Sequence, residues 1–315
     1  MDEIIKVEDL TKTYKLRKKE IKAVVDVSFS VRKGEILAIL GPNGAGKTTL
    51  IKMLSTLVLP TSGKAFVCGF DVVKDDARVR HCIGLSTGFE RSFYYRLTGF
   101  QNLQFFGALY GIRGKKLNDR INELMAFFDL ENAKDMLYMK YSTGMKKKLS
   151  LARALIHDPK VLMLDEPTSS IDPKSAIEIR QRIVEMRAKK KSIILATHDL
   201  HEAEALADRI AILKSGKILT IDTPTNLKKY LKHEVIKIKT DRIIGKDIFL
   251  KNGLKGKIKR VESNGNTLSI HVENSEEIID ELLKRTKASG AKLLKVNVEE
   301  PSLEEVFLNF MGENR

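Results

Sequence analysis

The sequence predicts an α/β core of about 225 residues, interrupted by a mostly helical insert and followed by a small α+β domain. The core is indicated by short apolar runs such as KVLMLDE and KSIILATH, which resemble buried strands and are separated by a helical segment. Amphipathic periodicity between about residues 89 and 157 indicates the insert. A fresh series of alternating strands after residue 225 indicates the last domain.

Strands are predicted at the start of the chain and again near its end. IIKVEDLTKTY and AVVDVSFSVRKGE are predicted as two strands, and KAFVCGFDV as another after the first helix. RIAILKSGKILTID is predicted as a hairpin with a Ser215-Gly216 turn. In the last domain, EVIKIKTD, GKIKRVES, TLSIHVEN and AKLLKVNVEE are predicted strands. Asn264-Gly265 is the predicted turn of a second hairpin, and residues 275–285 are predicted as a helix.

A glycine-rich loop joins a strand to a helix in the segment ILAILGPNGAGKTTLIKML. Residues 35–40 are predicted as a buried strand and residues 48–57 as a helix, so residues 41–47 form the turn between them. In a loop of the form G-x-x-x-x-G-K-[ST], backbone N–H groups converge on an anion and the helix adds its N-terminal dipole. We expect Lys47 to reach the β- and γ-phosphates of a nucleoside triphosphate, and the Thr48 hydroxyl to bind Mg²⁺.

Two carboxylates and a histidine follow later apolar runs. In VLMLDEP, Asp165 is placed to hold Mg²⁺, and Glu166 is placed one residue further on to polarise an attacking water. His198 ends the run SIILATH, where a parallel sheet brings it beside them, so its imidazole is expected to bond the γ-phosphate. These groups predict hydrolysis of the nucleotide.

A second anion-binding arrangement lies in YSTGMKKKLSLARAL, where Ser142 and Gly144 start a helix. One nucleotide does not need two phosphate-binding loops. The simplest explanation is that the second arrangement contacts a nucleotide held by another subunit.

The ordered set of motifs resembles the ATP-binding subunits of ABC transporters, specifically those of the ABC-2, drug-export-like type. GPNGAGKTT matches the Walker A motif, VLMLDEP the Walker B motif, YSTGM the signature motif and SSID the D-loop, and His198 stands at the place of the switch histidine. The resemblance covers about residues 4–225, and the tail EEPSLEEVFLNFMG is similar to the ends of drug- and antibiotic-export members.

The resemblance implies a fold and a set of site residues. The fold is a P-loop NTPase (ABC ATPase) core at residues 1–225 with an antiparallel β subdomain and a helical subdomain at about 89–157, plus a C-terminal accessory α+β domain at 226–315. Catalytic roles fall to Glu166, His198 and Lys47, and metal binding to Thr48 and Asp165. The nucleotide-binding residues are Tyr14, which stacks on adenine, and Gly41, Pro42, Asn43, Gly44, Ala45, Gly46, Lys47, Thr48, Thr49, Ser142, Thr143, Gly144, Met145 and Asp172.

The implied protein is an ATPase that uses ATP and Mg²⁺ and forms a homodimer with two ATP molecules between the copies. It is expected at the cytoplasmic face of the cell membrane, powering transport, with export implied by the family likeness, through a separately encoded permease. The chain shows no apolar stretch of about 18 to 20 residues and no signal-peptide pattern. The alternative is a soluble ABC-type ATPase acting on ribosomes or DNA, although one cassette without long coiled-coil arms fits neither layout.

The lysine-rich composition gives a formal charge of +15, which is compatible with nucleic acid, a membrane surface or an ordinary solvated surface. Clusters such as MKKKLS lack interleaved aromatic residues, so we expect solvated lysines, and nucleic acid is not expected as a partner. Cys68 and Cys82 are expected to be reduced thiols without a chemical role.

The sequence departs from the family pattern in two places. Gly88 stands where the family has a glutamine that touches Mg²⁺, so either Glu90 substitutes or a water does. Thr143 and Met145 replace residues of the common signature motif, which leaves a contact to the opposite ribose open. Residues 93–95, three adjacent aromatics, are expected to dock a helix of the permease or to pack within the insert. The last domain shows no catalytic motif and either regulates the ATPase or stabilises the dimer.

Overall fold

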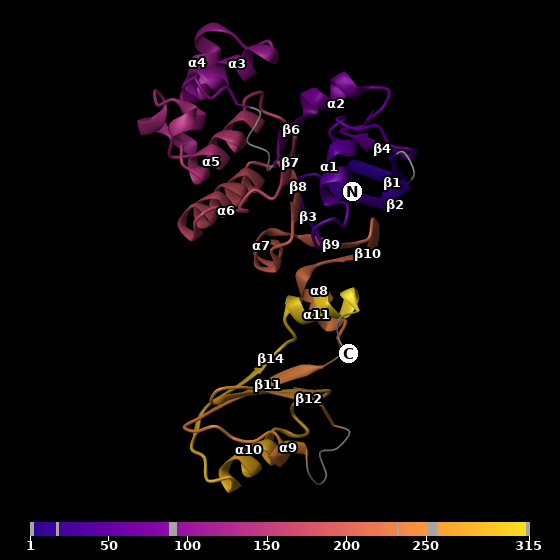
Figure 1. The fold of residues 1–315 in the computed structure, drawn as a ribbon, viewed down its shortest axis with the longest axis vertical. Coiled ribbons are helices and arrows are strands. Elements are labelled where there is room, and N and C mark those ends of the chain that lie inside the picture. Colours follow the sequence, from indigo (N-terminus) through magenta and orange to yellow (C-terminus); the bar gives the residue numbers. More distant parts are fainter. Residues whose placement is uncertain (1–2, 17–18, 88–92, 232, 251–256, 313–315) are drawn as a thin grey trace. The chain divides into compact units, whose positions relative to one another are not determined.

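The computed structural model describes residues 3–16, 19–87, 93–231, 233–250 and 257–312 of the 315-residue chain (Figure 1). The chain divides into two compact units, Met1–Thr223 and Pro224–Arg315. The domain boundary predicted from the sequence, between residues 225 and 226, lies two residues later. Within the described residues, none of the helices combines the length and the apolar character that crossing a bilayer requires.

A six-stranded sheet forms the centre of the first unit. Its strands are β3 (Ile36–Leu40), β6 (Ile83–Ser86), β7 (Val161–Asp165), β8 (Ser192–Thr197), β9 (Arg209–Lys214) and β10 (Lys217–Asp222). In the order β10-β9-β3-β8-β7-β6, neighbours from β9 to β6 pair in parallel, and β10 joins the edge antiparallel. Every residue of β3, β7 and β8 is buried, as expected for parallel strands covered on both faces. The predicted Ser215-Gly216 hairpin turn is confirmed between β9 and β10.

A second, antiparallel sheet in the order β2-β1-β4-β5 lies beside the central sheet. Its strands are β1 (Glu3–Leu16), β2 (Lys19–Arg32), β4 (Ser62–Val67) and β5 (Phe70–Asp71). Buried residues of this sheet, such as Val7 and Val27, share one apolar core with Ile39 of the central sheet. The antiparallel β subdomain implied by the resemblance is confirmed.

Helices cover both faces of the central sheet (Figure 1). They are α1 (Lys47–Leu54), α2 (Asp76–Cys82), α3 (Gly99–Leu109), α4 (Gly114–Phe127), α5 (Thr143–Ala154), α6 (Pro173–Ala188) and α7 (Leu200–Leu206), with 3₁₀ turns at Glu131–Ala133 and Tyr138–Lys140. Because side chains alternate along a strand, Met163 and Ile194 face the core that includes α1. Leu164 and Leu195 face a second core, which is shared with α3 to α6. The helical subdomain implied by the resemblance is confirmed.

The second unit is an antiparallel sheet in the order β12-β13-β11-β14 with helices packed on it. Its elements are α8 (Pro224–Lys229), β11 (Glu234–Thr240), α9 (Asp247–Leu250), β12 (Ile258–Asn264), β13 (Thr267–Val272), α10 (Ile279–Ala288), β14 (Leu293–Glu299) and α11 (Leu303–Met311). Phe249 and Leu282 pack on Ile236 and Ile270 of the sheet. The turn between β12 and β13 lies at residues 265 and 266, one residue later than predicted, because Asn264 pairs with a strand residue.

Candidate nucleotide-binding and catalytic site

The glycine-rich loop leaves the carboxyl end of β3 and enters α1, as the sequence predicts. A Cβ on Gly41 would lie 2.4 Å from the carbonyl oxygen of Leu213. Gly46 has a φ of +110°, and a Cβ there would lie 2.3 Å from the carbonyl oxygen of Ala23. Only glycine fits at both positions, so close packing against β9 and β2 holds the loop in place.

Lys47 is the first residue of α1, and its side chain folds back into the loop. Its Nζ donates to the carbonyl oxygens of Gly41 at 2.7 Å and Pro42 at 3.2 Å. The residue before it, Gly46, is the N-cap, and no described side chain caps this end of α1. The loop therefore combines a buried ammonium with a helix start whose N–H groups are available to bind an anion.

Glu166 lies between two predicted catalytic residues. Its Oε1 is 3.4 Å from Nζ of Lys47, and its Oε2 accepts a hydrogen bond of 2.7 Å from Nδ1 of His198. The Glu166 backbone has a φ of +53°, and its N–H donates to the carbonyl of Ala196 in β8. Because β7 and β8 are parallel, their carboxyl ends bring Glu166 and His198 together at one edge of the sheet.

Asp165, the last residue of β7, is a buried carboxylate with one oxygen that no described residue hydrogen-bonds. The residue is 4% exposed, and its Oδ1 has no hydrogen-bond partner among the described residues. Burial raises the pKa of Asp165, while a hydrogen bond from the Thr48 side chain acts in the opposite direction. A buried carboxylate beside a hydroxyl fits a divalent cation with oxygen ligands.

The signature-motif residues lie at the start of α5. Ser142 is exposed, and its Oγ accepts a hydrogen bond of 3.2 Å from the Met145 N–H, so it caps the helix. Gly144 is buried, and a Cβ there would lie 2.4 Å from Oγ of Ser175, so a larger residue would not fit without a shift. Asp172 caps α6 by accepting from the N–H of Ser175, and this contact lowers the pKa of Asp172. Within the described residues, no hydrogen bond or ion pair joins residues 142–145 to the phosphate loop of the same chain.

Tyr14 is half-buried in β1 and pairs with Ile21 of β2. The ammonium of Lys12 lies 5.1 Å from the centre of its ring. Further along β2, Ala23 contacts Gly46 of the phosphate loop, so Tyr14 belongs to the strand pair beside that loop. Its stacking on adenine stays a prediction.

The lysines of MKKKLS correct the expectation of a solvated cluster. Lys147 and Lys148 are only 6% and 8% exposed. Nζ of Lys147 donates to the carbonyl oxygen of Glu166 at 2.9 Å, and Nζ of Lys148 lies 2.8 Å from Oε2 of Glu178. In a helical projection of α5, Lys147 and Lys148 lie on the same face as the buried Gly144 and Leu151. This spacing indicates that the two lysines are buried, which their lysine-rich surroundings in the sequence do not suggest.

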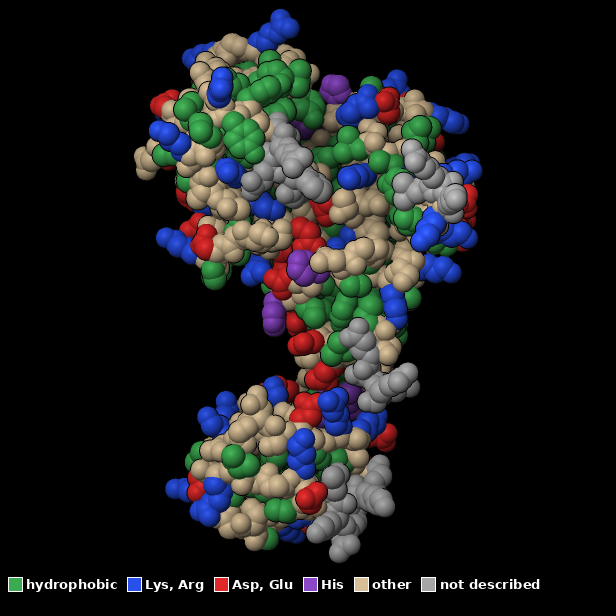
Figure 2. Space-filling model, in the orientation of Figure 1, with side chains coloured by type: hydrophobic (Ala, Val, Ile, Leu, Met, Phe, Trp, Pro, Cys, Tyr) green, Lys and Arg blue, Asp and Glu red, His purple; other side chains and the backbone are tan. Residues whose placement is uncertain are grey.

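The three adjacent aromatics divide between the core and the surface. Phe93 is buried, stacked at 4.8 Å on the ring of Tyr138, so its predicted part in docking is wrong. Tyr94 and Tyr95 are 50% and 47% exposed, and Figure 2 shows hydrophobic side chains gathered over this part of the helical subdomain. Gly88 and Glu90, the candidates for the missing glutamine, lie outside the described residues.

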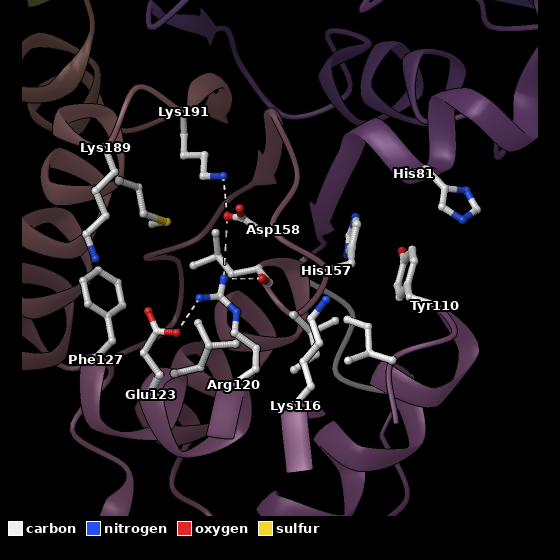
Figure 3. Close-up of a pocket in the computed structure, with 15 residues that line it drawn as sticks. His81, Tyr110, Lys116, Arg120, Glu123, Phe127, His157, Asp158, Lys189 and Lys191 are labelled. Carbon is white, nitrogen blue, oxygen red and sulfur yellow. Dashed lines mark hydrogen bonds and ion pairs between the residues drawn. The ribbon is translucent and has the colours of Figure 1, made fainter. Parts of the chain in front are cut away.

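A cavity of about 770 Å³ is separate from these groups (Figure 3). It is lined by Asp158 and Lys191, which precede β7 and β8 and form an ion pair of 2.6 Å, and by His157, which stacks on Tyr110. The cavity therefore lies at the amino ends of the parallel strands, whereas Glu166 lies at their carboxyl ends. It is not the nucleotide site.

The sequence matches two known family profiles. Residues 24–169 match the profile described as ABC transporter. Residues 223–311 match the profile described as ATP-binding protein DrrA1-3-like, C-terminal domain.

Individual proteins are similar over nearly the whole chain. The linearmycin resistance ATP-binding protein LnrL of Bacillus subtilis (strain 168) is 34% identical over 312 residues, which are 98% of this chain and 98% of LnrL. The daunorubicin resistance ATP-binding protein DrrA2 of Streptomyces coeruleorubidus is 34% identical over 300 residues, covering 93% of this chain and 91% of DrrA2.

The structure of the ATP-binding cassette MJ0796, a dimer in a post-hydrolysis state with ADP and Pi, covers 70% of this chain and 98% of its own, with a TM-score of 0.65 and 26% identity.

Proposed function

The chain belongs to the ABC transporter family as an ATP-binding, ATP-hydrolysing subunit, and we propose that it powers export through a membrane permease on a separate chain. The resistance proteins LnrL and DrrA2 are similar over more than nine-tenths of this chain, which supports outward transport. The alternative of a ribosome- or DNA-associated ATPase gains no support from these relatives.

The position of the Glu166 carboxylate, between Lys47 and His198, carries this proposal. From there Glu166 polarises a water for attack on the γ-phosphate. His198 holds the carboxylate in its orientation through the hydrogen bond from Nδ1. Lys47 places a positive charge inside the loop that binds the phosphates, where it balances the charge that develops during transfer.

Thr48 and Asp165 fit a Mg²⁺ ion, because one offers a hydroxyl and the other a buried carboxylate oxygen without a partner among the described residues. When bound, Mg²⁺ neutralises charge on the β- and γ-phosphate oxygens.

The signature-motif residues support a homodimer with two ATP molecules between the copies. Ser142 and Thr143 are exposed at the start of α5, where N–H groups and the helix dipole favour an anion. They have no described bond to their own phosphate loop, and the similar cassette MJ0796 is dimeric. Each ATP is then held by residues 41–49 of one copy and residues 142–145 of the other.

The Glu166→Gln variant tests the ATPase and the dimer together. Hydrolysis should fall by about 10² to 10⁴, the effect of losing a general base, while ATP binding persists through the phosphate loop. Size-exclusion chromatography should then show a dimer with ATP that disappears with ADP. Adding Ser142→Arg should abolish that dimer and leave ATP affinity of the monomer unchanged. Loss of ATP binding by the monomer would instead mean that both arrangements serve one nucleotide within one chain.

An exposed apolar surface on the helical subdomain supports the permease as partner. The exposed rings of Tyr94 and Phe105 lie 4.9 Å apart, and the N–H of Met139 donates to the carbonyl of Tyr95. Leu109, one turn beyond Phe105 on α3, is 68% exposed. Such a continuous apolar surface indicates an interaction site, and docking here places the chain peripherally on the cytoplasmic face of the membrane.

Paired substitutions separate docking from packing in this region. Tyr94→Ser with Tyr95→Ser should weaken recruitment to permease-containing membranes several-fold with little change in melting temperature, because half-exposed rings contribute less to the core. Phe93→Ala should show the opposite pattern, since truncating a buried phenylalanine costs about 3–5 kcal/mol. Co-sedimentation with membranes and thermal denaturation measure the two effects. If the double serine variant is recruited normally but melts several degrees lower, this surface is not the docking site.

A further inference from the structure

Three side chains with metal-binding atoms converge in the second unit. His233 directly precedes β11, His271 lies in β13 opposite Val235, and Glu305 lies in the first turn of α11. They are separated by up to 72 residues in sequence, and all three line one cavity of about 510 Å³. His271 is 7% exposed, and side-chain exposure is 12% for His233 and 32% for Glu305.

The three donor atoms form a nearly equilateral triangle. Nε2 of His233 is 3.3 Å from Oε2 of Glu305 and 3.3 Å from Nδ1 of His271. Nδ1 of His271 is 3.5 Å from Oε2 of Glu305. Ligand atoms about 2.0–2.2 Å from a tetrahedral Zn²⁺ lie about 3.3–3.6 Å from one another. The triangle therefore has the dimensions of three corners of a zinc coordination tetrahedron.

Neighbouring hydrogen bonds orient two of the three side chains for this role. Nδ1 of His233 lies 2.9 Å from the carbonyl oxygen of Leu231, an oxygen that can only accept, so Nδ1 carries the proton. In the neutral ring, the lone pair is then on Nε2, the atom that faces the triangle. On Glu305, Oε1 is 3.3 Å from the Ser302 hydroxyl, which leaves Oε2 directed at the two histidines. Metal-binding histidines and carboxylates are commonly held by such outer hydrogen bonds.

Hydrogen bonds within the triangle do not account for it. Because Nε2 of His233 carries a lone pair, the proton that a ring nitrogen can supply within the triangle is one on Nδ1 of His271, and that proton can point along only one edge. Burial lowers the pKa of His271, with the Glu305 carboxylate acting in the opposite direction. Burial therefore favours the neutral imidazole, which is the form that can bind a metal ion.

We propose that His233, His271 and Glu305 bind a divalent transition-metal ion, for which Zn²⁺ is the best match. Two imidazole nitrogens and one carboxylate oxygen are donors that Zn²⁺ accepts, whereas Mg²⁺ prefers oxygen ligands in octahedral geometry. Water occupies the fourth position from the side of the cavity. The ion ties α11 to β11 and β13, so its binding stabilises the second unit.

Equilibrium dialysis of the full-length protein tests the site. The protein is first freed of metal with a chelator, then dialysed against Zn²⁺ with excess Mg²⁺ and without nucleotide, and its bound zinc is measured by mass spectrometry. We expect one tightly held Zn²⁺ per chain. His233→Gln and Glu305→Gln should each lose it, and binding of Co²⁺ should give the visible absorption of a low-coordinate N/O site only in the unaltered protein.

His201→Gln is the matched control, because it makes the same substitution at an exposed histidine of the first unit, three residues from His198 and outside the cluster. It should retain one Zn²⁺ per chain. Zn²⁺ should also raise the melting temperature of the unaltered protein and of His201→Gln, and leave both cluster variants unchanged. If circular dichroism shows that one cluster variant has failed to fold, the zinc content of the other cluster variant is used to judge the proposal. Retention of zinc by a folded cluster variant, its loss from the control, or the absence of tight zinc in the unaltered protein would overturn the proposal.

Discussion

The nucleotide-binding edge of the first unit and the cluster of His233, His271 and Glu305 in the second are both assembled from distant parts of the chain, yet only the first is marked in the sequence. Asp165 ends β7, and His198 directly follows β8. Parallel strands place their carboxyl ends at one edge, so a residue just after an apolar run has a foreseeable position. In the second unit, the antiparallel pairing of β11 with β13 and the position of the start of α11 bring the three side chains together. No local sequence motif identifies them as a possible metal site.

Lys47→Ala tests whether the two regions work independently, and it should have a larger effect on ATP hydrolysis than the lysine and serine substitutions that follow. Removing the cation inside the phosphate loop should lower ATP hydrolysis by about 10² to 10³, the loss typical of one group that stabilises developing charge. Zinc bound by the second unit should remain at one ion per chain. Phosphate release and equilibrium dialysis measure the two quantities, and a parallel fall in bound zinc would show that the sites are coupled.

Lys147→Met tests whether a residue that was not among the predicted site residues contributes to the nucleotide-binding site. Lys147 donates to the backbone carbonyl of Glu166, so its loss should disturb the position of the carboxylate. We expect kcat to fall roughly 10- to 100-fold, the equivalent of a 1.5–3 kcal/mol hydrogen bond from a charged group, with KM for ATP nearly unchanged.

Lys148→Met is the control for this variant. Lys148 is equally buried on α5 but pairs with Glu178 and makes no described hydrogen bond to Glu166. Its loss should lower stability rather than kcat. Equal effects of the two substitutions on kcat would mean that Lys147 acts only through the packing of α5.

Much of the fold and of the nucleotide site could be predicted, because local pattern and tertiary position coincide there. The strands β3, β7 and β8 are continuous apolar runs. The conformation of the phosphate loop depends on Gly41 and Gly46, which lie within the loop itself. The burial of Lys147 could not be predicted from composition, since a lysine is buried only where distant acceptors such as the Glu166 carbonyl meet it. Burial of Phe93 likewise depends on Tyr138, which lies 45 residues away along the chain.

The second unit was predictable in class but not in detail. Alternating strands and a helical segment predicted a small α+β domain, but the hairpin after β12 turns one residue later than expected. In the ladder, Asn264 pairs with Thr267, so the turn falls on Gly265, whose φ is +57°, and the following asparagine. A one-residue change of register reverses which side chains face the core. Clusters that depend on register, such as that of His271, therefore become visible only in three dimensions.

The smallest expected effect comes from two serines that play the same local role in the two regions. Ser142 caps α5 and Ser302 caps α11, each accepting a hydrogen bond of 3.2 Å from an N–H three residues later. Replacing either with alanine should cost about 1 kcal/mol of stability.

Only Ser302 also touches a proposed zinc ligand, at 3.3 Å from Oε1 of Glu305, so Ser302→Ala alone should weaken zinc binding. We expect a loss of no more than about tenfold, the lower end for an outer partner of a metal ligand, because both histidines remain. Ser142→Ala should leave zinc affinity unchanged and weaken the ATP-dependent dimer. Competition titration with a chromogenic chelator measures the first effect, and size-exclusion chromatography in the Glu166→Gln background measures the second. If the two alanine substitutions lowered zinc affinity equally, the effect would come from general destabilisation, and Ser302 would have no part in orienting Glu305.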